Sequence, residues 1–286
     1  MRGSSSTEAD SEIHTKIVQT QTERHHESCC SLLLVLCYLA GSQAWRCSEA
    51  PRLSNTLQID AGLGKVVAVT KYNRAYFLTG GRWYSLGTTG LRHVSVGPAG
   101  MWATGTSNRL YKYIAGKFQV ASGLSLQQVD AGGDGQVVGI QSGNLLARCL
   151  RESSALAYKG VGSLYWTSLS RTMRYYSCSP NNGCWGVDSS YRVYFTQRIT
   201  PSSCGTSGWV NVPGHTMTMI EVSTDGSVFG VNRTGQVYQR LGISRSRPQG
   251  TAWRLVSMCM SIRHVSYDLG QLWAVTTSGL IMQCTH

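Results

Sequence analysis

Hydrophobic and polar residues alternate along most of this chain in short segments, separated by turns rich in glycine, serine and asparagine. Such alternation predicts β-strands, and no segment shows a helical period of any length. One pattern occurs six times: a large anchor residue, a polar residue, a turn, and a second apolar segment that contains alanine or glycine. The anchors are Ile59, Val94, Val129, Tyr176, Ile220 and Val265, and the small residues are Ala68, Ala103, Gly139, Gly186, Gly230 and Ala274.

The spacing of these copies predicts the fold. The anchors are separated by 35, 35, 47, 44 and 45 residues, and a strand-built repeat of roughly 35–50 residues is typical of a β-propeller. The second copy predicts four strands, at 91–96, 100–105, 109–114 and 117–122. The last copy lacks a fourth strand, whereas residues 46–56 form a strand-like segment before the first copy. We therefore predict an all-β, six-bladed propeller of four-stranded blades over residues 45–286, in which this N-terminal strand completes the last blade and removes its open edge.

Residues 1–44 differ from the rest of the chain. Their apolar run, at 31–40, is too short for a membrane-spanning helix, which needs ~20 residues. It fits the apolar core of a signal peptide, and Ser42 and Ala44 provide small residues at the cleavage position. We therefore expect a leader at 1–44, no membrane span, and secretion of residues 45–286 to the extracellular space; a plain apolar strand or a wrongly assigned start is the alternative.

The chain is strongly basic, with a formal net charge of +12. Such a surface favours anionic partners such as phosphorylated glycolipids or acidic glycans. The basic residues are scattered singly, and only Arg240, Arg245, Arg247 and Arg254 resemble a cluster. Weak steering and solubility therefore explain the charge better than a specific patch, and we expect no nucleic-acid partner.

Seven cysteines follow the leader, and a secreted chain is expected to pair them. The repeat register places Cys178 and Cys184 on facing strands, Cys149 and Cys204 at the ends of corresponding outer segments, and Cys47 and Cys284 where the ring closes. Cys259 is left over and is expected to remain a free thiol. A metal-binding role is weaker, because no Cys-x-x-Cys pair or histidine at ligand spacing accompanies these residues.

Tryptophans occupy two positions of the repeat. Some precede the small residue of the second strand, and others open the fourth strand. Packing between neighbouring blades is the favoured interpretation, and stacking on sugar rings is the alternative. The candidate carbohydrate-binding residues are Trp83, Trp102, Trp185, Trp209, Trp253 and Trp273.

Polar residues follow every anchor and would line the centre of a propeller. Hydrogen bonding to a neighbouring strand is the favoured role, but a calcium ion near Asp60, Asp130 and Glu221 would also use such oxygens. No arrangement of nucleophile, base and orienting residue is recognisable, so we predict no enzyme activity, no catalytic residues and no required cofactor. Asn232, Arg233 and Thr234 form an N-glycosylation sequon at the edge of a strand.

Four segments resemble the fish-egg lectins, secreted members of the tectonin-repeat β-propellers. The resemblance covers residues 45–286, and the segments are QVDAG at 128–132, CWGV at 184–187, MIEVSTDGSVFGVN at 219–232 and RHVSYDLG at 263–270. It implies a six-bladed lectin that binds N-acetylglucosamine-containing glycans and bacterial lipopolysaccharide in egg or innate immune defence. It leaves homodimerisation and calcium binding open. It also implies a cysteine near the position of Thr276, which departs from that pattern and leaves Cys259 without that partner.

Two functions are therefore considered. The first is a multivalent secreted lectin, since weak sites repeated around a ring gain avidity on a dense glycan surface. The alternative is a protein-interaction propeller with a yolk or membrane protein as its partner and only incidental affinity for glycans.

Overall fold

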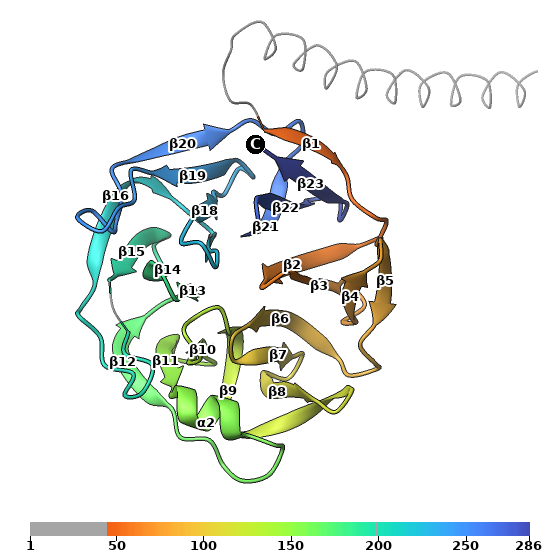
Figure 1. Cartoon of the computed structure of the whole chain (residues 1–286), viewed down its shortest axis with the longest axis vertical. Helices are drawn as coiled ribbons and strands as arrows, with labels where there is room; N and C mark the ends of the chain where they lie inside the picture. The colour runs from red at the N-terminus through yellow and green to blue at the C-terminus, as the bar shows by residue number, and fades with distance from the viewer. Residues whose placement is uncertain (1–44, 198) are drawn as a thin grey trace, which may run out of the picture. The chain divides into compact units, whose positions relative to one another are not determined.

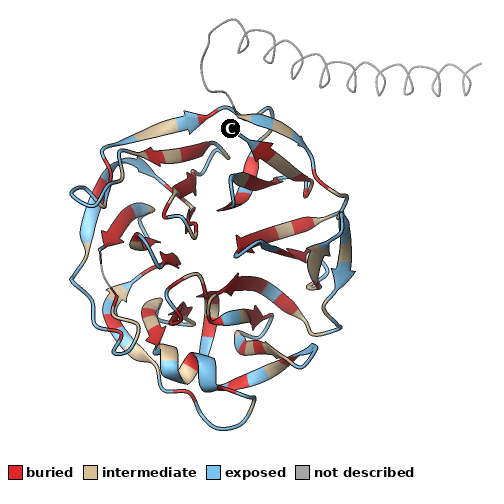
Figure 2. Ribbon diagram, viewed as in Figure 1, coloured by how far each residue is buried: buried red, intermediate tan, exposed pale blue. Residues whose placement is uncertain are grey.

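The structure, a computed structural model, describes residues 45–197 and 199–286, so the predicted leader at 1–44 lies outside the described residues. The described part is an all-β propeller whose sheets are arranged around a common centre (Figure 1). The inner strand of each repeat is buried along most of its length, whereas the outer strands are largely exposed (Figure 2). In this part of the chain, no helix is long and apolar enough to cross a membrane.

Four separate sheets have four antiparallel strands each. In the order of the chain, their strands are β2 (Thr56–Gly62), β3 (Lys65–Thr70), β4 (Ala75–Thr79) and β5 (Arg82–Ser85); β13 (Tyr175–Ser179), β14 (Gly183–Val187), β15 (Arg192–Thr196) and β16 (Val210–Thr216); β17 (Met219–Val222), β18 (Val228–Val231), β19 (Val237–Leu241) and β20 (Ala252–Val256); and β21 (Ile262–Asp268), β22 (Gln271–Thr276), β23 (Ile281–Thr285) and β1 (Arg46–Glu49).

The second and third repeats share one sheet of seven strands. They form a single sheet because β9 (Lys117–Asp130) stays extended from one repeat into the next: it pairs with β8 up to Ser125 and with β10 from Leu126 onward. The other strands of this sheet are β6 (Leu91–Gly97), β7 (Gly100–Gly105), β8 (Arg109–Ile114), β10 (Val137–Gln141), β11 (Leu146–Leu150) and β12 (Thr167–Thr172). A short helix, α2 (Glu152–Ala157), follows β11 and was not expected from the sequence, because six residues are too few to show a helical period.

The predicted closure by the N-terminal strand is present. β1 pairs with β23, and Cys47 lies opposite Cys284, to which it is joined by a disulfide. Cys149–Cys204 and Cys178–Cys184 are the other two disulfides of the described residues. The repeat register of the sequence predicted each of these three disulfide pairs.

The repeated pair of anchor and small residue has a direct structural cause. Each anchor lies opposite its small residue across the first two strands of a repeat, as Ile220 lies opposite Gly230. A Cβ atom on Gly230 would lie 3.0 Å from Met217 Sδ, and one on Gly139 would lie 2.8 Å from Leu126 Cδ1. The small residue therefore leaves room for a side chain that enters the core just before the inner strand.

Candidate functional site

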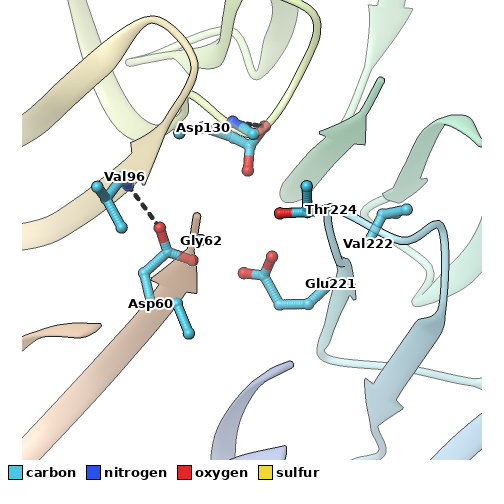
Figure 3. Close-up of a pocket in the computed structure, with 10 residues that line it drawn as sticks. Asp60, Gly62, Val96, Asp130, Glu221, Val222 and Thr224 are labelled. Carbon is cyan, nitrogen blue, oxygen red and sulfur yellow. Dashed lines mark hydrogen bonds between the residues drawn. The ribbon is translucent and has the colours of Figure 1, made fainter. Parts of the chain in front are cut away.

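The polar residues that follow the anchors meet at the centre of the ring. Asp60, Asp130 and Glu221 lie on the inner strands β2, β9 and β17, and their carboxyl groups point toward a common centre (Figure 3). Each is at least nine-tenths buried. Serines occupy the three positions between them, at Ser95, Ser177 and Ser266.

Most of these residues join one inner strand to the next. Asp60 Oδ2 accepts a hydrogen bond from the Val96 N–H at 2.6 Å, and Asp130 Oδ1 accepts one from the Cys178 N–H at 3.0 Å. The three serines act alike, accepting from the N–H groups of Ala131, Val222 and Ala61 at 2.9, 3.1 and 2.9 Å. Backbone groups that the central opening would otherwise leave unpaired are thereby satisfied, as the favoured sequence interpretation expected.

Glu221 departs from this pattern. Its Oε1 accepts a hydrogen bond from the Tyr175 hydroxyl at 2.5 Å, and its Oε2 accepts one from Ser177 at 2.8 Å, so it bonds back to the preceding blade. The same Tyr175 oxygen lies 2.8 Å from His264 Nε2 and 3.3 Å from His93 Nε2. Since the single hydroxyl hydrogen is directed at Glu221, the two imidazoles are left to donate to the tyrosine oxygen.

Tyr175 is the member of this network that sequence reasoning missed. It directly precedes an anchor, a position held in other repeats by Gln58, His93, Gln128 and His264. A register position that is polar in five repeats was the available signal. These residues lie two positions before the central carboxylates and serines on each inner strand. Among them, Tyr175 contacts Glu221 directly.

Burial dominates the electrostatics of the centre. It raises the pKa of Asp60 to about 6, against hydrogen bonds from Val96 and the serines that lower it. Burial, with the charge of Asp60, raises the pKa of Asp130 to about 8. Burial and the charges of Asp60 and Asp130 raise the pKa of Glu221 well above its usual range. Desolvation lowers the pKa of His93 and of His264 to about 3, so both imidazoles are neutral.

A calcium ion near Asp60, Asp130 and Glu221 was the alternative role for these carboxylates. Among the described residues, no group of three His, Cys, Asp or Glu side chains is placed to hold a metal ion. The three carboxylates already accept hydrogen bonds from backbone, serine and tyrosine donors. The arrangement therefore fits a hydrogen-bonded seam between blades better than a calcium site.

Three of the six candidate tryptophans are closed to a ligand. Trp102, Trp185 and Trp273 are 0%, 0% and 4% exposed and lie in three different core clusters. Packing, which the sequence already favoured, accounts for these three.

The other three candidates keep part of their surface at the rim. Trp83, Trp209 and Trp253 are half-buried, and Trp253 packs edge-on against Trp185 with ring centroids 6.2 Å apart. The Arg240 guanidinium lies over the Trp253 ring, 5.1 Å from its centroid. Trp45 directly precedes β1 and packs on Phe229 at 5.7 Å, so it supplies the outer aromatic that the last repeat lacks in sequence.

Asn232 and Cys259 lie apart from these aromatic positions. Asn232 is half-buried in the turn between β18 and β19, where its Oδ1 accepts hydrogen bonds from Thr234 and Gln236. Cys259 is exposed between β20 and β21, outside the three disulfides.

A family model described as the tectonin domain matches residues 55–277, which is most of the propeller. The chain belongs to the tectonin family. The resemblance of the four sequence segments to tectonin-repeat lectins is thereby confirmed.

Two curated proteins extend the comparison. Fish-egg lectin of Cyprinus carpio is 40% identical to this tectonin protein over 159 residues, which cover 55% of this chain and 65% of the lectin. The perivitellin-2 31 kDa subunit of Pomacea maculata is 30% identical over 239 residues, covering 65% of this chain and 82% of that subunit. The match therefore spans slightly less than two thirds of the carp protein.

Solved structures share the fold at much lower identity. A gluconolactonase of Xanthomonas campestris superposes with a TM-score of 0.62 and 10% identity, covering 84% of this chain and 89% of the enzyme. A streptogramin B lyase gives a TM-score of 0.55 and 13% identity, covering 85% and 99%. At such identities the likeness shows the propeller fold alone.

Proposed function

We propose that this tectonin protein is a secreted, non-enzymatic, multivalent lectin that binds N-acetylglucosamine-containing glycans and bacterial lipopolysaccharide in egg or innate immune defence. The observation that carries the proposal is the 40% identity to carp fish-egg lectin within a chain that matches the tectonin domain over residues 55–277. Three disulfides suit an oxidising, extracellular compartment. A leader at 1–44 would deliver the chain there.

The number of blades bears on valency. We count the seven-stranded sheet as two blades, because β9 serves as the outer strand of one repeat and the inner strand of the next. With the four separate sheets, this count gives six blades. Repeated weak sites on one rigid ring raise avidity on a dense glycan surface without a strong single site.

The rim tryptophans are the proposed sugar contacts. Trp83, Trp209 and Trp253 retain exposed surface, unlike the three core tryptophans. An indole face stacks on the apolar face of a pyranose ring, and neighbouring polar groups fix the sugar's orientation. The proposal does not require a cofactor, and calcium dependence is examined in the same assay.

Retention on N-acetylglucosamine resin is the test. The wild-type protein should bind, elute with free N-acetylglucosamine, and pull down lipopolysaccharide. Trp253→Leu should weaken binding to the resin. Tyr84→Leu changes an exposed aromatic side chain on β5 and should bind the resin like the wild type. Parallel runs with EDTA test calcium, and size-exclusion chromatography tests the homodimer. Failure of the folded wild-type protein to bind both ligands would overturn the lectin proposal.

A protein-interaction propeller is the second candidate. The specific observation behind it is the 30% identity to a protein named as a subunit, the perivitellin-2 31 kDa subunit. The link between α2 and β12 exposes Val161 and Tyr165 at 88% and 85%, which offers an apolar contact. Co-purification of one stoichiometric yolk or membrane protein that withstands free sugar and depends on Val161 and Tyr165 would favour this function.

A further inference from the structure

Two arginines flank one tyrosine ring on the surface of the propeller. The guanidinium carbons of Arg174 and Arg233 each lie 5.0 Å from the centroid of the Tyr191 ring. Arg174 Nη1 also donates to the Tyr191 hydroxyl at 3.3 Å. Both arginines are exposed and the tyrosine is half-buried, although the three residues come from three different loops. We call this set the Arg–Tyr–Arg cluster.

The backbone holds the central ring in place. Tyr191 has a positive φ of 64°, in the tight turn between β14 and β15. Its N–H donates to the Asp188 carbonyl at 3.0 Å, and its own carbonyl accepts from the Met217 N–H at 2.9 Å. Arg174 is held at its N–H, which donates to the Val187 carbonyl at 2.6 Å. The backbone of Tyr191 and of Arg174 is therefore fixed before any ligand binds, which reduces the entropy lost on binding.

The positive charge of the cluster is not neutralised within the protein. Among residues 45–197 and 199–286, the only salt bridge joins Arg192 to Asp188. Asp188 is saturated by that contact and by the N–H groups of Ser190 and Arg192. The guanidinium groups of Arg174 and Arg233 are therefore available to bind an anionic ligand.

The cluster lies on a face of the propeller whose exposed charged residues are mostly basic. Turns between second and third strands lie beside the links that lead into the next inner strand, as the Leu91 to Asn73, Met217 to Tyr191 and Ile262 to Gly235 hydrogen bonds show. Across the described part of these turns and links, Asp188 is the only acidic residue. Their exposed basic residues are Arg52, Lys71, Arg174 and Arg233. The adjoining strand ends add the exposed residues Arg92, Arg109, Arg192 and Arg263, and one exposed acid, Glu49.

The opposite face has a mixed charge. Turns between first and second strands carry Asp134 and Asp225. The connections between third and fourth strands, on the same face, carry Glu152 and the exposed basic residues Arg151, Lys159, Arg245 and Arg247. The sequence showed scattered basic residues, because their common face becomes apparent only when the repeats are superposed. The turns and links on the face of the Arg–Tyr–Arg cluster thus repel an anionic ligand less, because their one acid, Asp188, is paired with Arg192.

From this geometry we infer that the Arg–Tyr–Arg cluster binds the phosphate or sulfate group of an anionic sugar. Planar guanidinium groups donate paired hydrogen bonds to such oxyanions, and the tyrosine ring holds the two guanidinium groups near each other through cation–π contacts. This inference rests on the proposed lectin function and adds an anion-selective site that is separate from the rim tryptophans.

Titration with sugars that differ only in charge tests the inference. N-acetylglucosamine 6-phosphate, N-acetylglucosamine 6-sulfate, N-acetylglucosamine and inorganic phosphate are each titrated by calorimetry into protein produced in a host that does not attach N-glycans, because Asn232 adjoins Arg233 and enzymatic removal of a glycan would leave an aspartate there. We expect the phosphorylated and sulfated sugars to bind at least about tenfold more tightly than the neutral sugar, with a strong dependence on salt. Inorganic phosphate should bind more weakly, since it brings no sugar ring that can contact the protein.

A charge-matched pair of variants isolates the cluster. Arg174→Ala with Arg233→Ala should lose the preference for charged sugars and still bind N-acetylglucosamine resin. Arg245→Ala with Arg247→Ala removes the same charge from exposed positions in the β19–β20 loop and should keep the preference. Equal losses in both pairs would show a diffuse charge effect and overturn the inference. Equal affinity for the neutral and the charged sugars would also overturn the inference. If no sugar binds at all, the lectin proposal itself is refuted.

Discussion

The Tyr175 hydroxyl donates to the Glu221 carboxylate at 2.5 Å, and this contact replaces the link to the next blade that the other central residues make. Glutamate has one more methylene than aspartate, so it reaches back across the seam. The hydroxyl oxygen also meets His264 and His93, on the sixth and second repeats. One tyrosine thereby connects strands from four repeats at the buried centre.

Removing that hydroxyl should destabilise the ring. In Tyr175→Phe the buried Glu221 loses a donor and two imidazoles lose their shared acceptor, which costs about 1–3 kcal/mol for an unsatisfied buried group. Chemical denaturation of Tyr175→Phe, Glu221→Gln and the double variant gives the coupling free energy between the two side chains. We expect the double variant to lose less stability than the two single losses added together; strict additivity would contradict a shared network.

Stability should fall as the pH rises from 6.5 to 8.5. The pKa of Asp130 is raised to about 8, so the folded protein keeps a proton that the unfolded chain releases near pH 4. The stabilisation from this proton on Asp130 is complete below about pH 4 and is lost as the pH rises through about 8. His93 and His264, with pKa values lowered to about 3, act in the opposite direction, and only below about pH 6.5.

Asp130→Asn is the variant that checks this pH dependence. Each unit of pH over which one proton differs costs ~1.4 kcal/mol, or about 3–6 °C in Tm. Scanning fluorimetry should show a smaller fall in Tm for Asp130→Asn than for wild type. The control Asp134→Asn changes an exposed aspartate in the adjacent turn and should follow wild type. Identical slopes in all three proteins would contradict the assignment.

The disulfide that closes the ring should contribute more than the disulfide of the tight turn. Cys47 and Cys284 are separated by 237 residues, and Cys178 and Cys184 by 6. Loop-closure entropy gives roughly 5 and roughly 2 kcal/mol for loops of these lengths. Replacing Cys47 and Cys284 together with serine should therefore lower the free energy of unfolding more than the same change at Cys178 and Cys184. Equal effects would show that β1 pairs firmly without its disulfide.

Close approach between adjacent inner strands should make Gly97 intolerant of a side chain. A Cβ atom on Gly97 would overlap the Ala131 carbonyl oxygen, which is backbone and cannot swing away. Gly97→Ala should cost about 1–3 kcal/mol. Gly90→Ala is the control, because the nearest atom to its Cβ would be Thr106 Oγ1 at 3.7 Å. Thermal denaturation that ranks Gly90→Ala as the less stable variant would refute this packing argument.

The sequence by itself determined the propeller, its closure by the N-terminal strand, and the three disulfides. These features follow from local periodicity and from a repeat whose register places equivalent residues together. The anchor Ile220 and its partner Gly230 illustrate this, because strand pairing alone sets them opposite each other.

The tertiary structure alone decided which tryptophans are buried, how Glu221 and Tyr175 meet, and that Arg174 and Arg233 flank Tyr191. Trp83 opens a fourth strand and Trp185 lies on a second strand, and either position could pack or bind a sugar; the exposure of each ring depends on packing between blades. The continuous strand β9 also escaped prediction, because its change of partner from β8 to β10 is invisible in alternation. Local patterns fix which strands form, whereas contacts between strands far apart in the chain decide what each side chain can touch.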